Sequence, residues 1–161
     1  MLLVLCALII PLNQAFALNL EGRLGVGFTN QVVTGIEALS VKLQQDPMNA
    51  IGFIAGLDSG EDNSSYALGG KYYRLIYDEP QLNFYSGLSA VYFSYPDPDD
   101  SSDTLTGHQL EASLGTEFSF SGLESIGFSF EFGIGVFQYD QESSFKTRGQ
   151  NILLSAVHFY L

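Results

Sequence analysis

Strict alternation of apolar and polar residues over two neighbouring stretches, 109–120 and 126–136, constrains this fold more than any other feature. One face carries apolar side chains: Leu110, Ala112, Leu114, Phe118, Ile126, Phe128, Phe130, Phe132, Ile134 and Val136. The other carries polar or small residues: Gln109, Glu111, Ser113, Glu117, Ser119, Gly127, Ser129, Glu131, Gly133 and Gly135. A period of two predicts β-strands. A wide apolar face opposite a small polar one is typical of a membrane barrel with a narrow, side-chain-filled lumen.

The same pattern recurs along the chain, and no helical stripe of useful length appears after residue 17. We expect eight strands, at 18–28, 36–44, 50–58, 66–77, 82–95, 109–120, 126–136 and 152–161. Tight turns are expected at 46–49, 78–81 and 121–125, and longer polar loops at 59–65, 96–107 and 140–151, with an intermediate connection at 29–35. The sequence therefore predicts an all-β fold, an up-and-down antiparallel transmembrane β-barrel of eight strands with both termini on the short-turn side.

A soluble, lipocalin-like barrel has the same alternation turned inside out. It would place the glycines of the polar face in contact with solvent, where they weaken strands without any gain. In a narrow lumen, glycines instead make room for longer neighbouring side chains. The chain also lacks tryptophan and a cysteine pair, both of which are frequent in lipocalins. The pattern therefore favours the membrane barrel.

The first 17 residues resemble a secretory signal peptide, with an apolar run followed by the cleavage motif Ala15-Phe16-Ala17. No Lys or Arg precedes the apolar run, so the true start codon is expected upstream. A lipoprotein signal ending at Cys6 is the alternative, but Leu5 is too bulky for the position before that cysteine. We expect a signal peptide over 1–17 and one barrel domain over 18–161. Because Cys6 is the only cysteine, the mature chain would contain no disulfide.

Composition limits the partners of the protein. The formal net charge is −12, and only 15% of the residues are charged. Without a basic patch to neutralise phosphates, nucleic acid is not an expected partner.

The C-terminal residues carry a resemblance to a known family. Leu153, Ser155, Val157, Phe159 and Leu161 alternate to the last residue. The whole mature chain resembles the small eight-stranded outer-membrane proteins of Gram-negative bacteria, of the OmpX type and the OmpA membrane domain. The resemblance implies an outer-membrane location, with lipid, lipopolysaccharide and the barrel-assembly machinery as partners, and a monomeric state. It also implies an assembly signal at Val157, Phe159 and Leu161, although the family most often ends in Phe rather than Leu.

Charged residues gather on the predicted inner face: Glu21, Arg23, Lys42, Lys71, Glu111, Glu117 and Glu131. Paired carboxylates can perform acid–base chemistry. We favour a cluster of ion pairs that neutralises charges removed from bulk water, because opposite charges come from strands near one another in a small barrel. Glu111 and Glu117 are expected to pair with Arg23 or Lys71.

His108 and His158 are the only histidines. Lipid A deacylases of similar fold use a His and a Ser two residues apart, but the corresponding residues here are Leu110 and Tyr160. Lipid A palmitoyltransferases use a His with an Asp-Ser pair near the outer face, for which Asp58-Ser59, Asp100-Ser101 and His108 are candidates. The order in the chain differs from that family, and its N-terminal helix is missing. We therefore predict no enzyme, no catalytic residue and no cofactor.

Two features of the predicted surface have alternative interpretations. The acidic loop 97–103 is rich in the oxygen ligands that Ca²⁺ prefers, but it lacks the glycine and terminal glutamate of an EF-hand. We predict a solvated loop that divalent ions bridge to lipopolysaccharide rather than a metal site. Aromatic residues near the strand ends are expected to form interfacial girdles or, alternatively, to stack on carbohydrate: Tyr66, Tyr72, Tyr77, Tyr92, Tyr95 and Phe159.

The functional prediction is an outer-membrane barrel with a structural, adhesive or surface-interaction role and a filled lumen. The alternatives are a narrow pore and a lipid A-modifying enzyme. A pore requires an open lumen, and an enzyme requires a positioned nucleophile.

Overall fold

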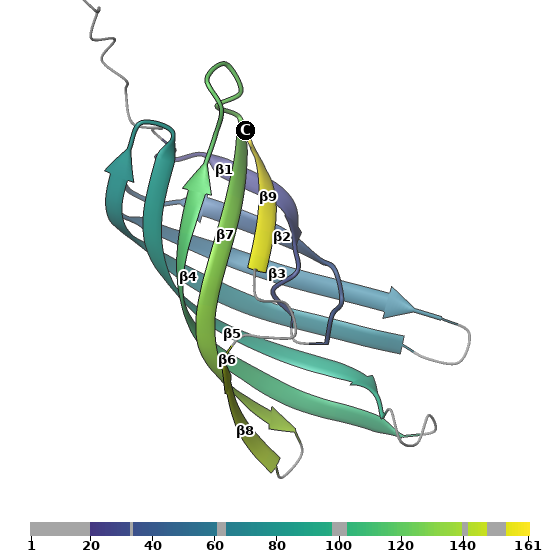
Figure 1. Ribbon diagram of the computed structural model, residues 1–161. Coiled ribbons are helices and arrows are strands. Elements are labelled where there is room, and N and C mark those ends of the chain that lie inside the picture. The colour runs from purple at the N-terminus through teal and green to yellow at the C-terminus, as the bar shows by residue number, and fades with distance from the viewer. Residues whose placement is uncertain (1–19, 33, 61–63, 98–102, 140–141, 148–153) are drawn as a thin grey trace, which may run out of the picture.

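The computed structural model describes residues 20–32, 34–60, 64–97, 103–139, 142–147 and 154–161 (Figure 1). These ranges form nine β-strands: β1 (Leu24–Thr29), β2 (Ala38–Gln44), β3 (Asn49–Ser59), β4 (Ser64–Glu79), β5 (Leu82–Pro96), β6 (Thr104–Phe118), β7 (Ile126–Tyr139), β8 (Glu142–Thr147) and β9 (Leu154–Tyr160). They contain no helix that is long and apolar enough to cross a membrane.

The strands close into a barrel. Each strand from β1 to β7 pairs antiparallel with the next one along the chain, and β9 joins β7 to β1. The eight-stranded, up-and-down antiparallel barrel predicted from the alternation is therefore confirmed, with β8 as one additional strand. Closure leaves no continuous free edge along the barrel wall.

Strand β8 corrects the prediction of a loop over 140–151. It pairs with the C-terminal half of β7, from Tyr139↔Glu142 to Ile134↔Thr147. Strand β9 pairs with the N-terminal half of the same β7 edge, from Glu131↔Leu154 to Ile126↔Phe159. The eighth position of the barrel is thus filled by two short strands in succession. Six residues, 148–153, separate them, whereas only two residues of β7 separate their partners, so the register shifts by four between β8 and β9.

Other strand boundaries also differ from the predictions. The first strand begins at Leu24 rather than at residue 18, because Gly22 has a φ of 73° and the Arg23 amide closes a turn by donating to the Leu20 carbonyl. Residues 18 and 19 lie outside the described ranges. The second strand begins at Ala38 rather than at 36, and β6 begins at Thr104 within the predicted loop 96–107.

The two ends of the barrel differ in their connections. At the turn end, the connections 45–48, 80–81 and 119–125 are short, and both Leu20 and Leu161 lie there. The opposite, loop end carries the remaining connections. Strands β4 to β7 have 14 to 16 residues, whereas β1, β2 and β9 have six or seven. One wall of the barrel therefore extends further toward the loop end than the other (Figure 1).

Alternating burial runs along the strands as the sequence pattern predicts. On β6, Gln109 and Glu111 are 1% and 5% exposed, whereas Leu110 and Leu114 are 60% and 47% exposed. Polar residues therefore face the interior, and large apolar residues cover the outer surface. This polarity is the reverse of that in a soluble barrel.

The turn between β2 and β3 is fixed by one carboxylate. Asp46 accepts hydrogen bonds from the Asn49 side chain at 2.9 Å and from the backbone amides of Met48 and Asn49 at 2.8 and 2.9 Å. The Asn49 side chain and then the Met48 amide lower the pKa of the Asp46 carboxyl from its ordinary value of 3.8. The ionised carboxylate thus holds the tight turn expected here from composition.

Candidate functional site

The centre of the barrel interior is organised by the Glu131 carboxylate on β7, which is 1% exposed. One oxygen accepts hydrogen bonds from Gln31 Nε2 and the Tyr85 hydroxyl, each at 2.8 Å. The other forms an ion pair with Lys71 Nζ on β4 and accepts the Ser113 hydroxyl at 2.8 Å. Four donors match the lone-pair capacity of an ionised carboxylate. The charge is therefore fully compensated despite its removal from water.

A second ion pair lies closer to the turn end. Lys42 Nζ on β2 lies 2.5 Å from Glu117 Oε2 on β6, and the Tyr160 hydroxyl donates to the other oxygen of Glu117. Lys42 Nζ also lies 4.8 Å from the ring centroid of Tyr73 and 5.3 Å from that of Tyr85, within the range of cation–π attraction. Both pairs connect strands on different sides of the interior, so they cross the space that an open pore would need.

Glycines make the room for these long side chains. A Cβ atom on Gly115 would lie 2.6 Å from Glu131 Cγ, and one on Gly127 would lie 2.7 Å from Glu117 Oε1. Both glycines face inward beside the two carboxylates. The volume that they leave is taken up by the charged residues across the interior.

The connection between β1 and β2 enters the barrel at the loop end. Gln31 is 4% exposed and bridges the Glu131 cluster, since its amide nitrogen donates to Glu131 while its oxygen accepts Lys71 Nζ at 3.0 Å. Gln109 Nε2 donates to the Gln31 carbonyl at 3.2 Å. This inward path was not predicted, because the sequence 29–35 shows only a connection of intermediate length.

Beyond Gln31, the loop end of the interior is apolar. Val32 is 3% exposed and packs with buried residues of β2 to β5: Ala38, Ile54, Ala67, Val91 and Phe93. Tyr95 and Tyr139 pack against the same cluster. The interior thus changes from two ion-paired layers to an apolar layer that includes part of the chain's own connection.

The other predicted charges of the interior have different positions. Arg23 donates to the Tyr160 carbonyl at 2.8 Å and to Ser125 Oγ at 3.2 Å, which places it at the turn end. Glu21 lies in the exposed turn before β1. Glu111 is buried and accepts Gln109 Nε2 at 3.0 Å. The expected pairing of Glu117 with Arg23 or Lys71 is wrong, because Lys42 takes that place.

Each histidine occupies a distinct environment. His158 is 1% exposed, and its Nε2 lies 2.9 Å from the Ser40 hydroxyl. The two side chains meet across Gly27, which pairs with both residues. A serine beside a histidine is the geometry of an activated nucleophile, but both side chains are buried and neither lines a described cavity. His108 lies on the outer surface, with its ring 5.2 Å from that of Tyr92.

Aromatic residues on the outer surface gather near both ends. The ring centroids of Tyr66 and Tyr92 lie 6.1 Å apart toward the loop end. Those of Tyr77 and Phe84 lie 6.3 Å apart toward the turn end. An unpredicted cluster is formed at the turn end by Phe118, Phe120, Phe128 and Phe130. Tyr95 corrects the girdle prediction, because it packs inside against Phe93 rather than outside.

Most of the acidic loop 97–103 lies outside the described residues, as does the Asp100-Ser101 pair. Asp58-Ser59 ends β3 at the loop end. In the part of the chain that the structure describes, no group of three or more His, Cys, Asp or Glu side chains is arranged to hold a metal ion.

Comparisons with protein-family models, with curated proteins and with solved structures return no match. The class of protein is therefore defined by the fold alone, as a closed up-and-down β-barrel with ion pairs inside and apolar side chains outside. The resemblance to OmpX-type and OmpA-type barrels stays a prediction from the sequence.

Replacing Glu131 with Ala is expected to lower the free energy of unfolding by about 3–5 kcal/mol, because it leaves the Lys71 ammonium buried beside unpaired donors. The double variant Lys71→Met with Glu131→Leu should recover much of this loss, since it removes both charges and refills the space. Urea unfolding followed by circular dichroism measures both effects. The exposed acid variant Asp58→Asn serves as the control and should unfold as the wild type does. A single variant as stable as wild type would contradict the role given to Glu131.

Proposed function

We propose that the protein is an outer-membrane β-barrel of a Gram-negative bacterium, with a structural, adhesive or surface-interaction role and a lumen filled by side chains. The observation that carries this proposal is the reversed polarity of the wall. Lys42, Lys71, Glu117 and Glu131 are buried inside, while large apolar residues are exposed on the outer face of the strands. A surrounding lipid bilayer removes those apolar side chains from water. A closed barrel supplies hydrogen-bond partners for the backbone N–H and C=O groups that lie within the bilayer.

The exposed apolar surface is too extensive for a soluble monomer. Phe28 of β1, Leu57 of β3 and Leu110 of β6 are each at least 60% exposed, and these three strands are not neighbours in the barrel. Contiguous apolar patches of this kind mark contact with a membrane or a partner. Burial of each such side chain contributes on the order of 1.5–3 kcal/mol. These exposures favour the membrane barrel over the lipocalin-like alternative.

The C-terminal strand supports the proposed partners of assembly. Phe159 and Leu161 are 51% and 80% exposed on the outer surface, and β9 closes the barrel by pairing with both β1 and β7. The barrel-assembly machinery would recognise this strand at Val157, Phe159 and Leu161 before closure. The signal peptide over 1–17, which lies outside the described residues, would direct export.

The loop end offers features suited to a surface-interaction role. Residues 57–59 of β3 pair with β4 but not with β2, and β8 pairs only with β7 among the described strands. Such strand edges can accept an added strand from a binding partner. The extended wall β3 to β7 would raise these edges toward the cell exterior.

A narrow pore is the main alternative, and the interior argues against it. The Lys42–Glu117 pair and the cluster around Glu131 are successive obstructions, followed by the Val32 layer. For an enzyme, the buried Ser40–His158 pair is the nearest approach to a nucleophile with its base, and substrate has no described route to it. We therefore maintain the proposal of a non-enzymatic barrel.

Cell fractionation tests the proposed location. The mature protein is expected in the outer membrane and, because a closed barrel resists detergent, it should migrate differently on gels with and without boiling. A matched variant lacking Phe159 to Leu161 loses the end of the closing strand and should fail to assemble. Recovery of the wild type as a soluble periplasmic protein would overturn the proposal in favour of the lipocalin-like barrel.

Planar-bilayer recordings separate the filled lumen from the pore. The wild-type protein is expected to give no stable ion conductance. The variant Glu117→Ala should also give none, because the cluster of Gln31, Lys71 and Glu131 still blocks the path. A known porin added to the same bilayer is the positive control. Reproducible single-channel steps from the wild type would make the pore the favoured function.

A further inference from the structure

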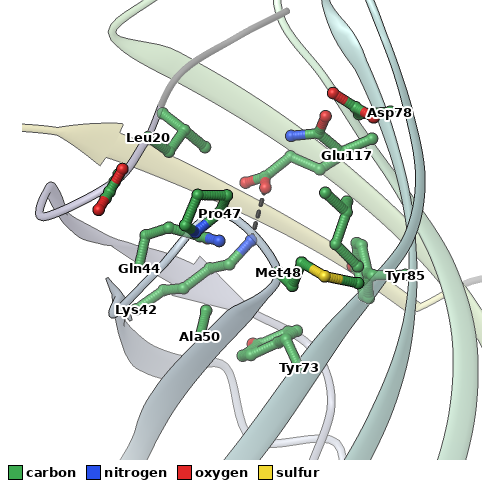
Figure 2. Close-up of a pocket in the computed structure, with 13 residues that line it drawn as sticks. Leu20, Lys42, Gln44, Pro47, Met48, Ala50, Tyr73, Asp78, Tyr85 and Glu117 are labelled. Carbon is green, nitrogen blue, oxygen red and sulfur yellow. Dashed lines mark hydrogen bonds and ion pairs between the residues drawn. The ribbon is translucent and has the colours of Figure 1, made fainter.

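The turn end of the interior contains a cavity of about 240 Å³ that neither the proposed function nor the ion pairs explain (Figure 2). Its lining includes the Lys42–Glu117 pair together with Tyr73 and Tyr85, and both ion-paired residues are labelled in the close-up. A cavity of this volume can hold several water molecules or one small organic molecule.

The charge of the lining favours a cation. Glu117 is compensated by Lys42, whereas Asp78 adds a carboxylate that makes no ion pair within the described part of the chain. Glu21 also lines the cavity. Since the whole protein carries a net charge of −12, anions are repelled from this opening and cations are concentrated there.

Polar groups beside Asp78 can complete the recognition of an ammonium group. Asn83 is the cross-strand partner of Asp78, and Asn83 is 9% exposed. Its side chain lines the cavity and makes no hydrogen bond with another described residue, and the same holds for the Tyr73 hydroxyl. The Asn83 side-chain amide lines the cavity, so its oxygen can accept a hydrogen bond from an N–H donor that sits next to the Asp78 carboxylate.

The rest of the lining suits an aliphatic stem. Leu20, Met48, Ala50 and Leu75 line the cavity together with Pro47. An ammonium head at Asp78 and Asn83 would leave a short hydrocarbon chain against these side chains. A metal ion would not use this apolar part of the lining.

We propose that the turn-end cavity is a binding site for a small aliphatic primary amine. The ammonium group binds between Asp78 and Asn83, and the carbon chain lies along Ala50 and Leu75. This inference does not depend on the outer-membrane location, because the cavity belongs to the folded barrel in either setting.

The test titrates n-butylamine into the purified, folded protein and follows the NMR signals of the Asn83 side-chain amide. At neutral pH the amine is protonated, and it should shift these signals in a saturable way. n-Butanol has the same stem without the charge, and butyrate has the opposite charge. Both are expected to bind more weakly than n-butylamine, by about tenfold for the alcohol because one charge-assisted hydrogen bond is lost.

Three variants locate the binding. Asp78→Asn should weaken n-butylamine binding by about fivefold, the effect of removing one partly exposed charge partner. Glu79→Gln removes the same charge from the next residue of β4, which does not line the cavity, and should leave the affinity unchanged. Ala50→Leu fills the cavity without altering its charge and should abolish binding, provided that heat-modifiable migration shows a folded barrel.

Three results would overturn the proposal. One is the absence of any saturable shift of the Asn83 amide in the wild-type protein. Another is equal binding of n-butanol and n-butylamine. The third is an equal loss of affinity in Glu79→Gln and Asp78→Asn, which would indicate attraction by the diffuse charge of the protein rather than a site. None of these results bears on fractionation or conductance, so this inference can fail while the proposed function stands.

Discussion

The structure depends on the compensation of charges inside a very small barrel. Eight strands enclose a space just wide enough for side chains, and a buried charge without a partner there costs several kcal/mol. Glu131 meets this constraint with four donors, and Glu117 meets it with Lys42 and Tyr160. The inward glycines follow from the same constraint. A long charged side chain has room in the interior only where a neighbouring inward position carries no side chain, as at Gly115 and Gly127.

The sequence predicts the wall of the barrel well, because a period of two is a local property. The polarity of each residue in β6 or β7 indicates whether its side chain faces the interior or the outer surface. The pairing of the strands then follows from the order of the turns. Lys42, Lys71, Glu117 and Glu131 were placed on the inner face by this pattern alone. Tyr95 was misassigned as a girdle residue, since an aromatic residue near a strand end suits either face.

What the sequence did not predict depends on contacts between distant segments. Gln31 and Val32 enter the interior because Glu131, Lys71 and the apolar ends of β3 to β5 accept them there. Nothing within 29–35 itself carries that information. The ion-pair partners were wrong for a similar reason, since the choice between Lys42 and Lys71 is set by strand tilt and stagger. Strand β8 was missed because its six residues, Glu142–Thr147, contain a single large apolar side chain, Phe145.

The central claim is that apolar residues face lipid while their alternate neighbours face a closed interior. Single cysteines placed along β6, in a chain with Cys6 removed, test it most directly when they carry a fluorescent label in bilayers that contain lipid-borne quenchers. Labels at positions 110, 112 and 114 should be quenched, whereas labels at 109, 111 and 113 should not. Quenching without alternation, or alternation of the opposite phase, would contradict the claim.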